Sequence, residues 1–311
     1  YNPYNQTLVV GYANGNLDLV KGNTTINLSD IKRNTSILGN KSINHIYFVN
    51  QYAYLSTGFG VVVINTDGEE VADTYSIGPT LGDVSVNAIT TDANFIYAAA
   101  EDGLYYANVN SPFLADFNEW SKRTDFVNTT VNNGPFSNIV NYGGTIYINY
   151  DDAAYNSDTM YYDEGSGWQR FDAILSLDNN GVEVSNGQLV VAHNGNVERF
   201  DQSRNVIENI FSFNGSEFIQ ANHAIYSPDG FTYIASKDRG LIKAWNAWSA
   251  SSMMPPGPYS NKAFAMDSEG DHVWVATGTV GGPWNIDYTN GIDGIFRFEN
   301  EEWSYYNHTN E

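Results

Sequence analysis

Short apolar runs alternate with turns rich in glycine, asparagine and aspartate along the whole chain. The clearest example is Phe95–Tyr106, in which two runs rich in alanine and tyrosine flank Asp102-Gly103. Aspartate followed by glycine is a strong signal for a tight turn, so this stretch predicts a β-hairpin. Long stretches with the spacing of an amphipathic helix do not occur. The pattern therefore predicts an all-β protein.

Weaker copies of this hairpin recur at a period of roughly 45 residues, which is in the range of propeller blades. The turn glycines mark the period, at Gly15, Gly60, Gly103, Gly195, Gly240 and Gly294. A second repeated phrase has the form Gly-Pro-aromatic-Ser-Asn, at Gly134–Asn138 and Gly257–Asn261. Proline is tolerated at the entry of a strand, so each phrase predicts the start of a new unit.

These units predict a seven-bladed β-propeller built from four-stranded antiparallel blades. We expect a single domain over residues 1–311 with a truncated first repeat. Short four-stranded sheets cannot bury both faces alone, whereas sheets packed radially can. A ring of eight blades, an incomplete ring and a pair of β-sandwiches stay open as alternatives. Ser249–Pro258 has the composition of a linker, but the period places it at the junction of two blades.

Composition narrows the range of partners. The chain has 36 acidic and 14 basic residues, and its net charge is -22. A phosphate backbone or an anionic membrane surface would be repelled, so nucleic acid is not an expected partner. No apolar run approaches the length of a membrane-spanning helix, and the chain is not expected to span a membrane. It has no cysteine, which excludes disulfides, and its start at Tyr1 predicts a processed or excised fragment.

Motifs of known reaction centres are absent, including phosphate loops, nucleophile elbows and dinucleotide fingerprints. Most acidic residues lie in predicted turns, where backbone geometry favours them, so we expect that the chain is not an enzyme. Ser227–Tyr233 faintly resembles the aspartate box of sialidases, but it reads more simply as a Ser-Pro-Asp-Gly turn. The five histidines are scattered, without the spacing of zinc ligands.

A calcium site needs clustered oxygen ligands. Two groups of acids provide candidates: Asp151, Asp152 and Asp158, and Asp267, Glu269 and Asp271. Each group also fits a solvated turn. The sequence therefore predicts no resident cofactor, with Ca²⁺ at one of these groups as the alternative.

Two predicted loops exceed the length that the repeat requires. Both lie between the second and third strands of their units, over residues 150–159 and 278–290. They combine aromatic rings with carboxylates, which suits a carbohydrate or a protein partner. The alternative is that each loop packs its own aromatic residues. The candidate binding residues are Trp284, Asp287, Tyr288, Asp151, Asp152 and Tyr155.

Several stretches resemble the N-terminal propeller of PorZ-like proteins, which belong to the type IX secretion system of Bacteroidetes. They are Gly11–Leu19, Ala53–Gly60, Ile96–Tyr106 and Asn110–Trp120, and Asp287–Phe298 with Trp303 fits the last blade. The shorter pattern aromatic-x-Ala/Ser-x-x-x-Gly-Leu is shared with the propellers of two-component regulators.

The resemblance implies a non-enzymatic scaffold or binding propeller at the cell surface or outer membrane. In PorZ-like proteins this propeller is followed by a second propeller and a C-terminal β-domain. The family implies an attachment complex that contains a sortase, and an association with anionic lipopolysaccharide. A net charge of -22 makes direct binding of such a glycan depend on a bridging cation or a local basic patch. The alternative function is a periplasmic glycan-sensing propeller of a two-component regulator.

Overall fold

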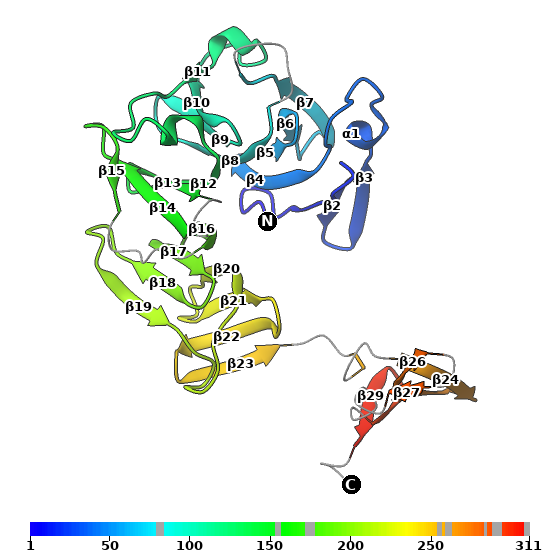
Figure 1. Ribbon diagram of the computed structural model, residues 1–311. Coiled ribbons are helices and arrows are strands. Elements are labelled where there is room, and N and C mark those ends of the chain that lie inside the picture. Colours follow the sequence, from blue (N-terminus) through cyan, green and yellow to red (C-terminus); the bar gives the residue numbers. More distant parts are fainter. Residues whose placement is uncertain are drawn as a thin grey trace. The chain divides into compact units, whose positions relative to one another are not determined.

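The computed structural model describes residues 1–78, 84–152, 157–171, 178–253, 257–258, 263–282, 285–287 and 294–307. In this part of the chain the regular structure is almost entirely β-strand, in antiparallel sheets whose strands follow sequence order (Figure 1). The short helical turns between them are α1 (Asp30–Arg33), η1 (Phe117–Glu119) and η2 (Val131–Asn133). The predicted all-β class is confirmed.

The first four sheets occupy the N-terminal half of the chain. The first has three strands, β1 (Leu8–Gly11), β2 (Leu17–Lys21) and β3 (Thr24–Leu28). The second has β4 (Ile43–Val49), β5 (Tyr52–Thr57), β6 (Gly60–Asn65) and β7 (Glu70–Tyr75). The third has β8 (Val86–Thr91), β9 (Phe95–Ala100), β10 (Gly103–Asn108) and β11 (Ser121–Lys122). The fourth has β12 (Phe136–Tyr142), β13 (Thr145–Asp152), β14 (Ser157–Asp163) and β15 (Gln169–Arg170).

Three further sheets complete the series. The fifth has β16 (Asn179–Ser185), β17 (Gln188–His193), β18 (Val197–Phe200) and β19 (Val206–Ile210). The sixth has β20 (Ala221–Tyr226), β21 (Thr232–Ser236), β22 (Gly240–Asn246) and β23 (Ser249–Met253). The seventh has β24 (Ala263–Glu269), β25 (His272–Thr277), β28 (Ile295–Glu299) and β29 (Glu302–Tyr306), with the hairpin β26 (Thr279–Gly282) and β27 (Asn285–Asp287) inserted. These seven sheets of the described chain match the predicted blades.

The chain separates into two compact units. The larger contains Tyr1–Asp238 and Ile242–Ser251, and the smaller contains Arg239–Leu241 and Ser252–Glu311. In the larger unit the sheets follow one another around a common centre, with the first strands β4, β8, β12, β16 and β20 innermost (Figure 1). Each of these strands contacts the next one. This is the arrangement of propeller blades. The extension of one propeller domain over residues 1–311 stays a prediction.

The hairpin Phe95–Tyr106 forms as predicted, from β9 and β10. Alternate side chains of β9 point to opposite faces of its sheet, as the pleat requires. Ile96 and Ala98 lie in the apolar core that the third sheet shares with the second. Tyr97 and Ala99 lie in the core that it shares with the fourth. One short strand therefore contributes to two inter-sheet cores.

The structure adds one strand that the sequence did not predict and corrects the bounds of one predicted turn. Ser249–Met253, which has the composition of a linker, is the strand β23 at the outer edge of the sixth sheet. The stretch after Tyr150 is not a long polar turn, because β13 and β14 pair as far as Asp152 and Ser157. The strand β23 lies at the edge of its sheet, where polar side chains reach solvent and the apolar alternation is lost. The strands β13 and β14 are central in their sheet, but they carry aspartates, which are typical of turns.

A β-bulge recurs near the start of each first strand from β4 to β20. The extra residue is Asn44, Asn87, Ser137, Asn180 or Asn222. A bulge leaves backbone groups outside the ladder. Three carbonyls next to a bulge accept a hydrogen bond from the bulge asparagine of the preceding sheet. The bonds are Asn44 Nδ2 to Val86 O at 2.8 Å, Asn87 Nδ2 to Phe136 O at 2.9 Å, and Asn180 Nδ2 to Ala221 O at 2.7 Å. These hydrogen bonds join the second sheet to the third, the third to the fourth, and the fifth to the sixth at their inner ends.

Replacing Asn87 with alanine should destabilise the larger unit. The carbonyl of Phe136 would lose its donor, and an unpaired buried polar group costs about 1–3 kcal/mol. We expect chemical denaturation to show a free energy of unfolding lower by about 1–2 kcal/mol. Asn110→Ala is the control, because Asn110 is exposed. Equal stabilities of the two variants would contradict this role of Asn87.

Candidate functional site

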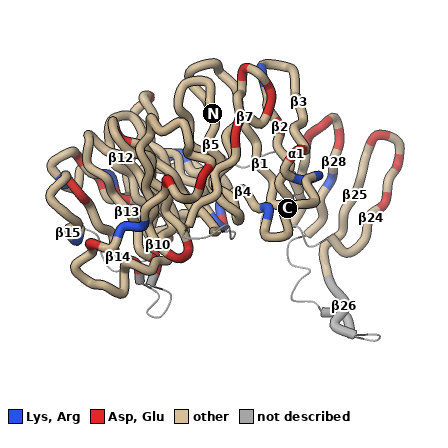
Figure 2. The backbone as a smooth tube through the Cα atoms, turned by 90° about the horizontal axis from the view of Figure 1, so that it is seen from above, with Lys and Arg blue, Asp and Glu red and all other residues tan. Residues whose placement is uncertain are grey.

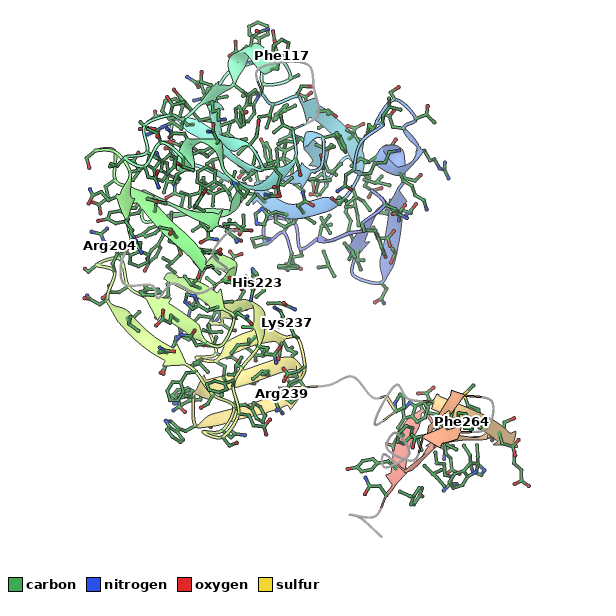
Figure 3. All side chains as sticks on the ribbon, viewed as in Figure 1. Phe117, Arg204, His223, Lys237, Arg239 and Phe264 are labelled. Carbon is green, nitrogen blue, oxygen red and sulfur yellow. The ribbon has the colours of Figure 1, made fainter. Side chains whose placement is uncertain are left out.

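The inner strands of five sheets enclose a cavity of about 450 Å³ in the larger unit. We call it the channel mouth. Glu101 follows β9, Asp151 lies near the end of β13, and the other lining residues come from first strands. The lining is Asn44, His45, Asn87, Glu101, Ser137, Asn138, Asp151, Asn180, Val182 and His223. Figure 3 places His223 on the inner side of the sixth sheet.

The amides of the channel mouth are held in fixed orientations. Asn87 Nδ2 donates both to Phe136 O and to Glu101 Oε1, the second at 2.9 Å. Ser42 Oγ donates to Asn44 Oδ1 at 2.8 Å. Because each of these groups already has structural partners, its position does not depend on a ligand. Such preorganisation reduces the entropy lost on binding.

Two histidines face the same cavity. Burial, reinforced by the nearby His223, lowers the pKa of His45 to about 4. The His223 side chain is 48% exposed, but the channel walls enclose it, and this burial lowers its pKa. Gly181 permits the close approach of β20, since a Cβ there would lie 2.8 Å from His223 Cδ2. Both imidazoles are therefore neutral at pH 7, and the carboxylates determine the charge of the cavity.

A buried chain of polar side chains leads away from the channel mouth between the fourth and fifth sheets. Asn149 Nδ2 donates to Ser137 Oγ at 2.8 Å, and Asn179 Nδ2 donates to Asn149 Oδ1 at 2.7 Å. His193 Nδ1 lies 2.6 Å from Asn179 Oδ1, and His193 Nε2 lies 3.2 Å from Glu198 Oε2. Asn149, Asn179 and His193 are all buried. Here Ser137 replaces the bulge asparagine, and this network provides the contact between sheets.

Asp158 joins the same network. Its Oδ2 accepts hydrogen bonds from Asn149 Nδ2 at 2.7 Å and from the backbone N–H of Asn179 at 2.8 Å. Burial outweighs these donors and raises the pKa of Asp158 to about 6. Ionisation of this carboxyl therefore opposes folding near neutral pH.

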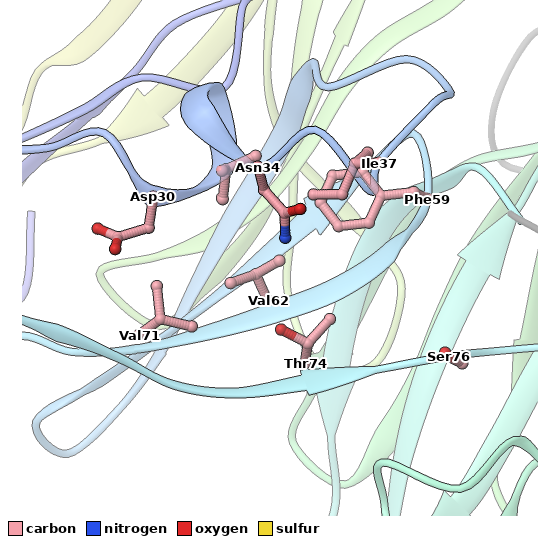
Figure 4. A pocket seen from close by; sticks show the side chains of 9 residues that line it. Asp30, Asn34, Ile37, Phe59, Val62, Val71, Thr74 and Ser76 are labelled. Atoms are coloured by element: carbon pink, nitrogen blue, oxygen red, sulfur yellow. The ribbon is translucent and has the colours of Figure 1, made fainter.

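A second, smaller cavity of about 350 Å³ lies beside the second sheet (Figure 4). Asp30 and Asn34, from α1 and its end, stand across it from Val62 and Val71. Its floor includes Phe59 and Val62, which belong to the apolar core between the first and second sheets. We interpret this cavity as a feature of that core rather than as a site.

Of the residues predicted to bind, Asp151 lies in the channel mouth. Asp152 pairs with Ser157 at the end of β13, and Asp287 ends β27. The other three predicted residues, Tyr155, Trp284 and Tyr288, fall outside the described residues. Of the three candidates that the structure describes, Asp152 and Asp287 do not line the channel mouth.

Sequence reasoning missed the channel-mouth asparagines. One asparagine recurs per repeat just before the apolar part of the first strand, as in Ile43-Asn44-His45 and Val86-Asn87-Ala88. This recurrence was the sequence signal from which the channel-mouth asparagines could have been predicted. Figure 2 shows acidic residues more often than basic ones along the backbone, but no group of three or more potential metal ligands occurs among the described residues. Calcium at either predicted group, Asp151 with Asp152 and Asp158 or Asp267 with Glu269 and Asp271, stays a prediction.

Two comparisons identify what the chain resembles. Residues 1–121 match the family model described as "TSS9, PorZ, N-terminal beta-propeller domain". The resemblance to PorZ-like propellers is thereby confirmed over this part of the chain. No curated protein matches the sequence. No helix in the described ranges is long and apolar enough to cross a membrane.

Solved structures establish the fold. PorZ of Porphyromonas gingivalis, an essential bacterial surface component of the type-IX secretion system, is 17% identical with a TM-score of 0.68, and the match covers 100% of this chain and 46% of PorZ. The extracellular domain of the putative hybrid two component system BT4673 from B. thetaiotaomicron is 13% identical with a TM-score of 0.61, with coverages of 100% and 46%. The WD40 domain of Neurospora crassa Pan2 is 11% identical with a TM-score of 0.55, with coverages of 88% and 83%. The chain is a β-propeller and spans about half the length of the first two structures.

Asp158 generates a pH-dependent prediction. Its folded-state pKa of about 6 exceeds the unfolded value of about 3.9, so the folded protein keeps a proton that the unfolded chain loses between these values. Stability should therefore fall as the pH rises from about 4 to 6. The Asp158→Asn variant, whose amide oxygen still accepts both hydrogen bonds, should lack this loss.

Denaturant titrations at pH 4.5 and 7.5 measure the effect. The free energy of unfolding of the variant, relative to the wild type, should rise by about 1–2 kcal/mol from pH 4.5 to pH 7.5. This value allows for solvent screening of a partly exposed carboxyl. Glu70→Gln, at an exposed position of β7, serves as the control. A stability difference that does not change with pH would contradict the raised pKa.

Proposed function

We propose that this chain is a non-enzymatic binding propeller of the bacterial surface or periplasm, and that its channel mouth holds protein partners of a type IX secretion attachment complex, including a sortase. The match of residues 1–121 to the PorZ N-terminal propeller carries the proposal. The PorZ structure supports it, since that protein is a surface component of the type-IX secretion system.

The chemistry of the channel mouth supports a protein partner. Neutral imidazoles, fixed amides and the carboxylates of Glu101 and Asp151 line a cavity of about 450 Å³. A loop of a partner protein could donate hydrogen bonds to this lining from its backbone N–H groups and from one basic side chain. Complementary charge across an interface chiefly raises the association rate and the specificity. The partner segment is thus expected to be basic or neutral.

The same cavity argues for binding rather than turnover. The histidines lie beside amides that are committed to structural hydrogen bonds, and catalysis by an imidazole requires a pKa near the working pH. His45, with a pKa of about 4, is far from that range. Turnover of a glycoside or peptide that depends on one channel-mouth carboxylate would overturn this part of the proposal.

Lipopolysaccharide is a less suitable occupant of the channel mouth. An anionic glycan would meet Glu101 and Asp151 on a chain whose net charge is -22. Contact at this place requires a bridging cation such as Ca²⁺. Binding that disappears on addition of a chelator would identify that route.

A glycan-sensing propeller of a two-component regulator is the second candidate. It is favoured by the likeness to the BT4673 extracellular domain over 100% of this chain. The two candidates differ in the partner, a secretion-complex protein in one case and a free saccharide in the other. They are separated by which class of partner binds at the channel mouth, that is, by which binding is weakened in the Glu101→Gln, Asp151→Asn variant.

Surface-immobilised chain and a purified type IX sortase provide the direct test. We expect saturable binding, with an association rate that falls as salt is added. The double variant Glu101→Gln, Asp151→Asn should slow association by about threefold to tenfold. Because both replacements keep oxygen acceptors, the fold should be retained.

Glu70→Gln removes one acidic charge on the outer strand β7 and serves as the control, with no change in association expected. Absence of binding to the sortase and to the other purified attachment-complex proteins would contradict the secretion role. Unchanged association in the double variant would contradict the channel mouth as the site.

A further inference from the structure

Another hollow of the larger unit is lined without any charged side chain. It is a cleft of about 600 Å³ formed by the fifth sheet and the connection from β19 to β20, within the range of roughly 300–1,000 Å³ typical of small-ligand sites. We call it the amide cleft. Its described lining is Asn194, Gly195, Asn196, Asn209, Phe211, Phe218 and Gln220. This contrasts with the net charge of -22 of the whole chain.

Two phenylalanine rings border the amide cleft and are open to solvent. Phe218 is 79% exposed and Phe211 is 45% exposed. Between Phe218 and Gln220 lies Ile219, which is fully buried in the core of the fifth and sixth sheets. Ile219 therefore anchors the segment, while Phe218 and Gln220 contribute to the cleft. Exposed aromatic rings at a concave site are typical of ligand recognition.

The segment that carries these rings is fixed to the sixth sheet. Trp248 packs against Gly215, where a Cβ would lie 2.2 Å from Trp248 Cζ3, and its ring meets that of Phe211 edge-on at 6.2 Å between centroids. Gly215 N donates to Ala247 O at 3.0 Å, and Ala250 N donates to Asn214 Oδ1 at 2.7 Å. The cleft wall is thus shaped before a ligand arrives.

One acceptor of the cleft is buried and unpaired. Asn209 Nδ2 donates to Glu198 Oε1 at 3.0 Å, which directs Asn209 Oδ1 toward Asn196 Nδ2 at 3.0 Å. The orientation of Asn196 is thereby set, and its Oδ1 accepts no hydrogen bond from any described residue. Asn196 is only 7% exposed. A buried acceptor is unfavourable without a donor, so a hydroxyl or N–H that reached this atom from the cleft would stabilise it.

We infer that the amide cleft binds an uncharged saccharide. A pyranose has an apolar C–H face that stacks on Phe218 or Phe211, and hydroxyl groups that pair with the amides of Asn194, Asn196 and Gln220. The side chains of Asn194 and Gln220 are exposed and line the cleft, so a ligand can reach their amides.

Other ligand classes fit the amide cleft less well. The net charge of the chain repels an anion, and a cation would find no carboxylate in the described lining. A wholly apolar ligand would bury the amides without partners. The site is separate from the channel mouth and does not depend on the proposed role in secretion. An uncharged peptide is the competing ligand and forms one arm of the test.

Isothermal titration of the full chain with maltotriose, cellotriose and triacetylchitotriose tests the inference. At least one of them should bind with 1:1 stoichiometry. Phe218→Ala should weaken that binding by about tenfold, and Gln220→Ala should also weaken it. Phe113→Ala is the matched control, because Phe113 is 64% exposed and lies outside the cleft. It should leave the affinity unchanged.

Three results would overturn the inference: no heat of binding from any of the three sugars, equal affinities of the wild type and Phe218→Ala, or binding of a neutral Gly-Ser-Ala tripeptide in preference to all three. Sortase binding measured in parallel separates the two sites. It should be unaffected by Phe218→Ala, so failure of one proposal is distinguishable from failure of the other.

Discussion

The channel mouth depends on one recurring interaction, the hydrogen bond from a side-chain amide on an inner strand to the bulge carbonyl of the next sheet, which three of the inner strands make. Asn44, Asn87 and Asn180 each make this bond at 2.7–2.9 Å. Apolar packing between sheets is non-directional and does not by itself fix how far one sheet slides against the next. A hydrogen bond that pairs a buried carbonyl fixes that position, and it also places the amides that line the cavity.

The exception at Ser137 connects this interaction to the rest of the larger unit. A serine is too short to reach the next sheet, and a chain of six hydrogen bonds replaces the missing amide. This chain begins at Ser137 in the channel mouth and ends at Asn196 in the amide cleft. Satisfied polar networks of this kind rigidify a core. The two proposed sites therefore share one buried support.

Local signals allowed much of the fold to be predicted. The hairpin Phe95–Tyr106 and the period of its copies depend on neighbours in sequence, so they are visible in the pattern of apolar and turn residues. Ser249–Met253 was missed because an edge strand with polar side chains lacks alternation. The stretch after Tyr150 was misread for a different reason: aspartates are typical of turns, but here they continue inside two paired central strands.

The site was harder to predict because its contacts join different repeats. Asn44 and Val86 are 42 residues apart, and Asn87 and Phe136 are 49 apart. The sequence shows the regular asparagine, but its partner follows only once the sheets are packed. Asp151, which the sequence offered as a binding candidate because of its position in an apparent loop, lines the channel mouth, and its role in binding stays a prediction. The amide cleft gave no sequence signal, because Phe211, Phe218 and Gln220 belong to an irregular connection.

Native-state hydrogen exchange of the full chain, followed by mass spectrometry, tests the central claim that the inner ends of the first strands are the rigid part of the larger unit. Exchange reports the free energy of local opening. Peptides covering the starts of β8, β12, β16 and β20 should exchange more slowly than those covering the outer strands β7, β11, β15 and β19. Equal or faster exchange at the inner starts would contradict the account.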